Sequence, residues 1–282
     1  MYSLIVENKY TEKLELTHNP AYSISDIDGL NPPEATINTS KNAGADGSVF
    51  NSAYTNSRQI VITMAINAPV ECNRIALYRY FKPKQPVRLY YKNSTRDLYI
   101  DGYVQSMPIQ YFDKKETIQI AIQCPLPYFS GSNSSVQEFN SIEPLFEFEM
   151  DLSEAGSEFS VLNPYVEKSI YNYGDVETGA IINIQCVGSV VNPVLFELEN
   201  NKKIGFNIEL ESGDLIVINT RQGEKAADLY REGVKTSIVG NLIEGSEFIQ
   251  FLPEDNLFTV SADEGAANMR IIFDVIDQYE GV

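Results

Sequence analysis

Short runs in which apolar and polar residues alternate dominate the first half of the chain. They occupy residues 2–6, 14–16, 21–27, 60–66, 87–91, 98–104, 109–112 and 117–123. The clearest is 117–123, where Ile118, Ile120 and Ile122 alternate with glutamine and alanine. A period of two indicates strands with one buried face. The pattern therefore predicts a mostly β first half, with a hairpin formed by 109–112 and 117–123.

One segment of the first half has helical rather than strand periodicity, over residues 69–81. Pro69 suits a first helical position, Glu71 complements the N-terminal end of the helix dipole, and Pro83 ends the pattern. The apolar stripe at helical spacing consists of Cys72, Ile75, Ala76 and Tyr80. This stripe predicts that the helix packs on a sheet.

The second half has short strand patterns and almost no helical signal. The predicted strands are 145–149, 180–186, 194–198, 204–210, 214–219 and 269–275. Short strands separated by turn residues predict an antiparallel sandwich. Between the halves, residues 130–136 read Ser-Gly-Ser-Asn-Ser-Ser-Val, a composition typical of linkers. We place the domain boundary there, giving domains 1–135 and 136–282.

The stretch 26–66 has the most unusual composition in the chain. Glycines at 29, 44 and 47 and the pair Pro32-Pro33 favour turns and oppose ladder pairing before the 60–66 strand. This predicts an ordered, irregular loop of about thirty residues, a length usually associated with function. Its apolar side chains, Ile37, Val49, Phe50 and Tyr54, favour docking to another surface.

Several motifs in this order resemble one protein family. They are Gly-Leu-Asn-Pro-Pro at 29–33, Asp-Gly-Ser at 46–48, Arg-Gln-Ile-Val-Ile at 58–62, the helix at 69–81, Cys-Pro-Leu-Pro-Tyr-Phe at 124–129 and Asn-Tyr-Gly-Asp-Val-Glu-Thr-Gly-Ala at 172–180. Together they resemble the distal tail proteins of phages, and the resemblance covers nearly the full chain. One departure is a late turn in which Glu254-Asp255 stands where glycine is expected.

The resemblance implies an N-terminal β-sandwich ring (belt) domain with one helix and a galectin-like C-terminal antiparallel β-sandwich. It also implies a virion structural protein of the tail or baseplate, made and assembled in the cytoplasm of the bacterial host. Six copies would form a ring joining the tail tube protein to the tail-tip hub, with receptor-binding proteins as further partners.

Within this picture, Asp46, Gly47 and Arg58 are the candidate contacts between subunits or with the tube. An alternative reading of the same residues is that Arg58 pairs with Asp46 inside one subunit.

Charge separates the two halves of this 282-residue chain, whose formal net charge is −18. Residues 1–137 carry 13 Lys+Arg and 12 Asp+Glu, whereas residues 138–282 carry 8 and 27. The resulting charge of −19 on the second half argues against nucleic acid or an anionic membrane as its partner. Six crowded copies of this half would repel one another, so we expect them to point outward from a near-neutral ring.

No apolar run approaches 18 residues and no secretory leader is evident, so we expect a soluble protein made in a cytoplasm. Three dispersed cysteines, Cys72, Cys124 and Cys186, predict buried reduced thiols rather than a disulfide or zinc site. His18 is the only histidine. A catalytic triad or metal centre would therefore lack ligands, and we expect no catalytic residue, metal or cofactor.

Two other functions stay open at this point. A carbohydrate-binding module that aids host-surface attachment could use Tyr171, Tyr173 and Tyr230 as aromatic platforms. An enzyme built on carboxylate pairs such as Glu147/Glu149 or Glu209/Glu211 ranks third, because strand alternation alone places both members on an exposed face.

Overall fold

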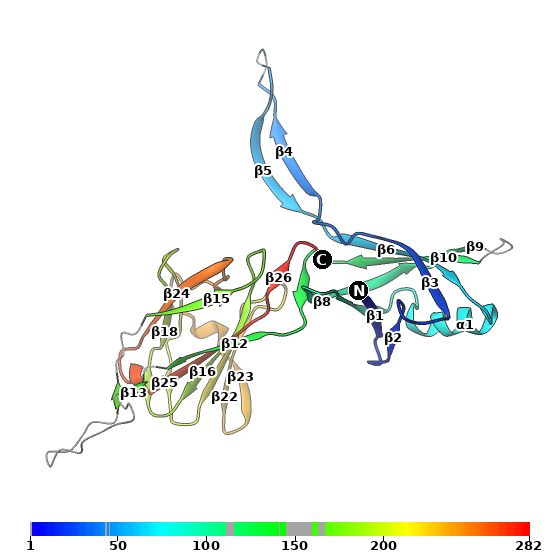
Figure 1. Cartoon of the computed structure of the whole chain (residues 1–282). Helices are drawn as coiled ribbons and strands as arrows, with labels where there is room; N and C mark the ends of the chain where they lie inside the picture. Colours follow the sequence, from blue (N-terminus) through cyan, green and yellow to red (C-terminus); the bar gives the residue numbers. More distant parts are fainter. Residues whose placement is uncertain are drawn as a thin grey trace, which may run out of the picture. The chain divides into compact units, whose positions relative to one another are not determined.

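The computed structural model describes residues 2–282 except 43, 45, 111–115, 141, 145–159 and 163–166. The chain divides into two compact units (Figure 1). The first unit contains Met1–Asn133 together with Gln278–Val282, and the second contains Ser134–Asp277. The return of residues 278–282 to the first unit was not foreseen from the sequence. That the units are a ring-forming domain and a galectin-like domain, divided near residue 135, stays a prediction.

An antiparallel sheet of ten strands forms the first unit. Its path runs β2-β1-β7-β8-β10-β6-β3; off this path, β9 pairs with β10, and β11 pairs with both β8 and β26. The strands are β1 (Ser3–Asn8), β2 (Lys13–Glu15), β3 (Tyr22–Asp28), β6 (Arg58–Ile66), β7 (Pro86–Lys92), β8 (Asp97–Ser106), β9 (Ile109–Gln110), β10 (Thr117–Cys124), β11 (Phe129–Gly131) and β26 (Gln278–Tyr279).

The core of this unit follows the alternation expected from the sequence. Ile118, Ile120 and Ile122 of β10 are fully buried and lie opposite Met64, Ile62 and Ile60 of β6. The predicted hairpin is confirmed in its described part, because Ile118 pairs with Ile109 of β9, and residues 111 and 112 of the predicted strand lie outside the described residues. Burial of these branched side chains on one face supplies the main driving force for this sheet.

Helix α1 (Val70–Tyr80) begins after the cis peptide bond between Ala68 and Pro69, close to the predicted range. The predicted apolar stripe is wrong, because Cys72, Ile75 and Ala76 are exposed. The buried residue of the helix is instead Leu77. Phe81, which directly follows the last residue of the helix, is also buried. Apolar residues lie on more than one side of this helix, so spacing alone did not identify the packed face.

The predicted irregular loop between β3 and β6 is a hairpin of two strands, β4 (Ala35–Ser40) and β5 (Val49–Thr55). These strands pair only with each other, as a separate two-stranded sheet. Both faces are largely exposed, so no buried face imposes the alternation by which strands are recognised in sequence. A bulge between Asn38 and Thr39 breaks the remaining pattern.

The second unit packs a six-stranded and a four-stranded antiparallel sheet around one hydrophobic core. The six-stranded sheet contains β12 (Ser135–Asn140), β25 (Met269–Val275), β16 (Ala180–Cys186), β21 (Leu215–Asn219), β22 (Ala226–Arg231) and β23 (Val234–Ser237). The four-stranded sheet contains β15 (Lys168–Asn172), β24 (Glu254–Ser261), β18 (Val194–Glu197) and β19 (Lys202–Gly205). Short pairs are β13 (Ile142–Pro144) with β14 (Ser160–Leu162) and β17 (Val190–Val191) with β20 (Glu209–Leu210).

Strand predictions in this unit were good where the core face is continuous. The predicted ranges 180–186 and 269–275 coincide with β16 and β25. The predicted strand 204–210 is divided between β19 and β20, and the predicted strand 145–149 lies outside the described residues. Phe251, Phe258 and Phe273 form the aromatic centre of the core, with ring centroids 5.1–5.9 Å apart.

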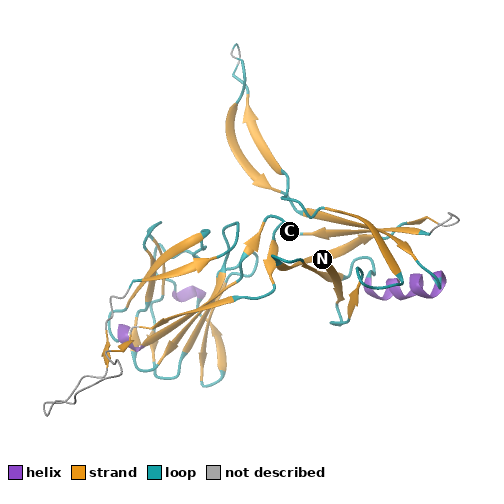
Figure 2. Cartoon of the chain, in the orientation of Figure 1, coloured by secondary structure: helices purple, strands orange, loops and turns teal. Residues whose placement is uncertain are grey.

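The predicted mostly β fold is confirmed (Figure 2). In the described part of the chain, α1 is the one α-helix, beside two short 3₁₀ turns, Val239–Asn241 and Ala266–Asn268. No helix among these residues has the length and apolar character needed to cross a membrane.

Candidate assembly interface

Hairpin β4–β5 exposes four large hydrophobic side chains. Ile37 is 62% exposed, Phe50 63%, Tyr54 54% and Val49 51%. Residues paired across an antiparallel ladder share a face, and successive pairs alternate between faces. Because Ile37 pairs with Ala53 and Thr39 with Phe50, the side chains of Ile37 and Phe50 lie on one face. Tyr54 and Val49 lie on the other, so both faces can bury apolar area against a partner.

The tip of the hairpin carries two of the predicted contact residues. Asp46 and Gly47 are exposed, and Gly47 has a φ of +91° that favours glycine. A Cβ added to Gly47 would meet no atom within 4 Å, so the tip is open on that side. The role of Asp46 and Gly47 in a contact stays a prediction.

Arg58, the third predicted contact residue, lies at the root of the hairpin and is only 5% exposed. It does not pair with Asp46; its guanidinium instead donates to the carbonyl oxygen of Gly29 at 2.9 Å and to that of Glu280. The guanidinium carbon lies 4.7 Å from the centre of the Phe129 ring. Burial lowers the pKa of Arg58, because the charged form is partly removed from water.

Residues 278–282, which we call the strap, supply one of the two carbonyl oxygens that bind Arg58. Tyr279 pairs with Phe129 through β26 and β11, and the guanidinium of Arg96 lies 4.7 Å from the Tyr279 ring centre. Arg96 also donates to the carbonyl oxygen of Gly281. The backbone N–H of Val282 donates to the carbonyl oxygen of Leu30 at 3.3 Å. Sequence analysis missed the strap, because a two-residue strand gives no periodic signal.

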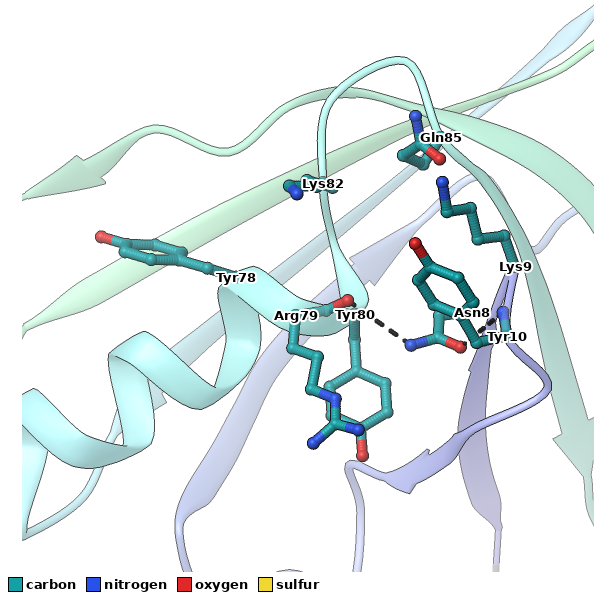
Figure 3. Close-up of a pocket in the computed structure, with 8 residues that line it drawn as sticks. All are labelled: Asn8, Lys9, Tyr10, Tyr78, Arg79, Tyr80, Lys82 and Gln85. Atoms are coloured by element: carbon teal, nitrogen blue, oxygen red, sulfur yellow. Dashed lines mark hydrogen bonds between the residues drawn. The ribbon is translucent and has the colours of Figure 1, made fainter.

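A cavity of about 270 Å³ opens at the C-terminal end of α1 (Figure 3). Its basic and aromatic lining consists of Lys9, Tyr10, Tyr78, Arg79, Tyr80 and Lys82. Arg79 is neutralised by Glu12, to which its Nε donates at 2.7 Å. The buried amide of Asn8 donates to Glu12 and accepts from the N–H of Tyr10, which fixes the wall. Lys9 and Lys82 in its lining give the cavity a positive charge that suits contact with an acidic side chain.

The candidate metal-binding and catalytic residues can be located in the described part of the chain. Among the described residues, no group of three or more His, Cys, Asp or Glu side chains could hold a metal ion. His18 is half-exposed and 4.0 Å from Glu15. Of the carboxylate pairs, Glu209 and Glu211 are exposed, and Glu147/Glu149 lies outside the described residues.

The prediction of buried thiols is confirmed for Cys124 and Cys186 and wrong for Cys72, which is exposed. All three are free. Burial raises the pKa of Cys124 to about 12 and that of Cys186 to about 11.

Two of the three candidate sugar-binding tyrosines come together. The ring centroids of Tyr171 and Tyr173 are 4.4 Å apart, and Tyr173 is 62% exposed. Tyr230 lies on β22, in the other sheet of the second unit. The structure therefore offers an aromatic pair rather than the three-tyrosine platform considered from the sequence.

Comparison with known proteins finds one matching domain family, within the first unit. Residues 10–124 match the family described as phage tail protein RIFT-related domain. No curated protein matches the sequence.

Solved structures match the whole fold. A structure of phage SPP1 titled "Crystal Structure of SPP1 Dit (gp 19.1) Protein, a Paradigm of Hub Adsorption Apparatus in Gram-positive Infecting Phages" matches with a TM-score of 0.71 and 11% identity, covering 99% of each chain. A chain of the phage P2 baseplate in its activated conformation with Ca matches with a TM-score of 0.58 and 11% identity, covering 100% of each chain. A chain of the phage p2 baseplate with Sr gives 0.54 at the same identity and coverage. The resemblance to distal tail proteins is thus confirmed in domain family and fold.

Proposed function

We propose that the chain is a non-enzymatic structural subunit of a phage tail, and that six copies form a ring joining the tail tube to the tail-tip hub. The observation that carries the proposal is hairpin β4–β5, a two-stranded element with exposed apolar residues on both faces, set in a phage tail domain. Such an element is stabilised when both faces are covered by neighbouring protein.

The charge distribution supports the same arrangement. The near-neutral first half allows copies to pack closely, whereas the strongly acidic second half favours wide separation. The second units would then point away from the ring and be free to contact hub or receptor-binding proteins. Scaffolding of this kind makes and breaks no covalent bond.

The mass of the particle in solution tests this proposal. Light scattering is expected to give about six times 31.6 kDa for the purified chain. The double variant Ile37→Ser/Phe50→Ser removes the apolar pair from one hairpin face and is expected to lower the mass toward one copy. Val234→Ser is the matched control, since Val234 is 64% exposed in the second unit.

The outcomes separate the two parts of the proposal. A monomeric wild-type chain would refute self-closure of the ring. A hexamer that persists in the hairpin variant would refute the hairpin as the contact.

A carbohydrate-binding role is the second candidate, favoured by the Tyr171–Tyr173 pair, in which Tyr173 is exposed and Tyr171 partly buried. An exposed aromatic face supported by a neighbouring ring can stack on a sugar ring. Glycan-array binding by the full chain that disappears in Tyr173→Ala would support it. Equal binding by the Tyr173→Ala chain would exclude this pair as the site.

A further inference from the structure

We propose that the strap acts as an internal peptide ligand of the first unit, and that its docking fixes the root of hairpin β4–β5. In this scheme Arg58 is the positioning residue that joins the strap to the root. The inference concerns the orientation of the hairpin and goes beyond its proposed role as a subunit contact.

The first unit binds the strap mainly through the backbone of the strap. Arg58 donates to the carbonyl oxygen of Glu280, and Arg96 donates to that of Gly281. Upstream, the backbone of Gln278 and Tyr279 pairs with β11. Hydrogen bonds to carbonyls combined with strand addition are the means by which proteins bind extended peptides. The strap is therefore bound as an extended peptide is bound.

Both legs of the hairpin meet the strap at this place. The leg that enters β4 contains Leu30, whose carbonyl accepts from the N–H of Val282. A Cβ added to Gly281 would lie 3.1 Å from that same oxygen and 3.2 Å from Pro32, so the strap and this leg are in close contact. The leg that leaves β5 continues into Arg58, the first residue of β6.

Arg58 joins these contacts into one unit. Its guanidinium binds the strap at Glu280 and the entering leg at Gly29. A buried guanidinium is costly unless its N–H groups are paired, so losing the strap carbonyl weakens the whole cluster. Removing the strap is therefore expected to free the root and, with it, the orientation of the hairpin.

Hydrogen exchange of a chain truncated after Asp277 tests this dependence. Exchange is expected to rise about tenfold in residues 29–34 and 55–60, as for the loss of one hydrogen bond to a charged group. Residues 180–186 of the second unit should keep their protection. Adding a synthetic peptide of residues 277–282 in excess should restore the protection of the root.

A second variant keeps the test independent of truncation. Gly281→Ala introduces the Cβ that presses on Leu30 and Pro32, whereas Gly240→Ala is a matched control because its Cβ would meet no atom within 4 Å. Faster exchange at the root in Gly281→Ala, with none in Gly240→Ala, is the expected result.

Two results would overturn the inference: unchanged exchange at the root in both strap variants, or an equal rise across the whole first unit. The proposed function fails separately. If the root loosens while the mass of the particle stays the same, the strap still controls the hairpin, but the hairpin is not the contact that closes the ring.

Discussion

At the scale of single residues, buried polar groups in this protein depend on specific partners. Arg58 is held by two backbone carbonyls, and the buried carboxylate of Asp214 is held by Arg231 and the N–H of Glu211. Asn256, also buried, accepts from the N–H of Leu252 and so fixes the turn in which Glu254 adopts a φ of +76°. The glycine expected there from the sequence would adopt this conformation without strain.

Asp214 predicts a pH dependence of stability. Its hydrogen bonds with Arg231 lower the pKa of the carboxyl group. The stabilisation is therefore complete above the unfolded pKa of about 3.9 and is lost as the pH falls through the folded value. Compared with Asp214→Asn, the wild-type chain should have the higher free energy of unfolding at pH 7, and the difference should shrink below pH 4. Urea unfolding at both pH values measures it.

Asp277 provides a control of opposite sign. Burial raises the pKa of this carboxyl group, so its stabilisation is present below the unfolded pKa and is lost as the pH rises through the folded value. Asp277→Asn, which can still accept from the N–H of Tyr173, should therefore be more stable than the wild type at pH 7. Two variants that shift stability in the same direction at pH 7 would contradict this assignment.

The burial of the cysteines predicts how many thiols react quickly in the folded chain. Cys72 is exposed, whereas burial raises the pKa of Cys124 to about 12 and that of Cys186 to about 11. Since the thiolate is the reactive form, one thiol per folded chain should react quickly with a disulfide reagent, and three after unfolding. A spectrophotometric titration gives both counts. A Cys72→Ser chain should show no fast reaction, and a fast reaction there would mean that a buried thiol is accessible.

At the scale of elements, continuous burial on one face determines which strands are predictable. Residues 180–186 and 269–275 alternate strictly over the core, and their ends were predicted correctly. Hairpin β4–β5 has no buried face, so its strands were interpreted as a loop, and the docking role expected for its apolar residues stays a prediction. Arg58 was singled out, but its partners were not, since Glu280 lies 222 residues away in the sequence.

Strand β10 offers the clearest test of the core. Ile120 is fully buried, and its neighbour Gln119 is exposed. Ile120→Ala should lower the free energy of unfolding by about 2–5 kcal/mol through lost burial and a residual cavity. Gln119→Ala should change it by less than about 0.5 kcal/mol. Similar losses for both variants in denaturant unfolding would show that β10 is stabilised by something other than its core face.

At the scale of the whole molecule, charge is the property that distinguishes the two halves. If six copies assemble, each brings a net charge of −18, and mutual repulsion opposes the assembly. Salt screens such repulsion, with a Debye length of about 10 Å at 0.1 M. The assembled fraction, measured by sedimentation velocity, should therefore increase as the salt concentration is raised from about 0.02 M to about 0.3 M. Dissociation by salt would instead indicate that attractive ion pairs hold the particle together.

The strap also gives the chain a particular order of synthesis and folding. The first unit contains residues from both ends of the described chain, so a ribosome delivers its final strand, β26, only after the entire second unit. The second unit is continuous and can fold as it emerges. Its first and last strands pair with each other, Ser135 opposite Val275, so its folding brings residue 278 back beside residue 133.

Folding of the second unit thereby reduces the loop-closure entropy that β26 must overcome to reach β11. Nascent chains that lack this last segment should therefore carry a hairpin whose root is not yet fixed. If the hairpin is the subunit contact proposed above, assembly would then wait until this segment has been translated.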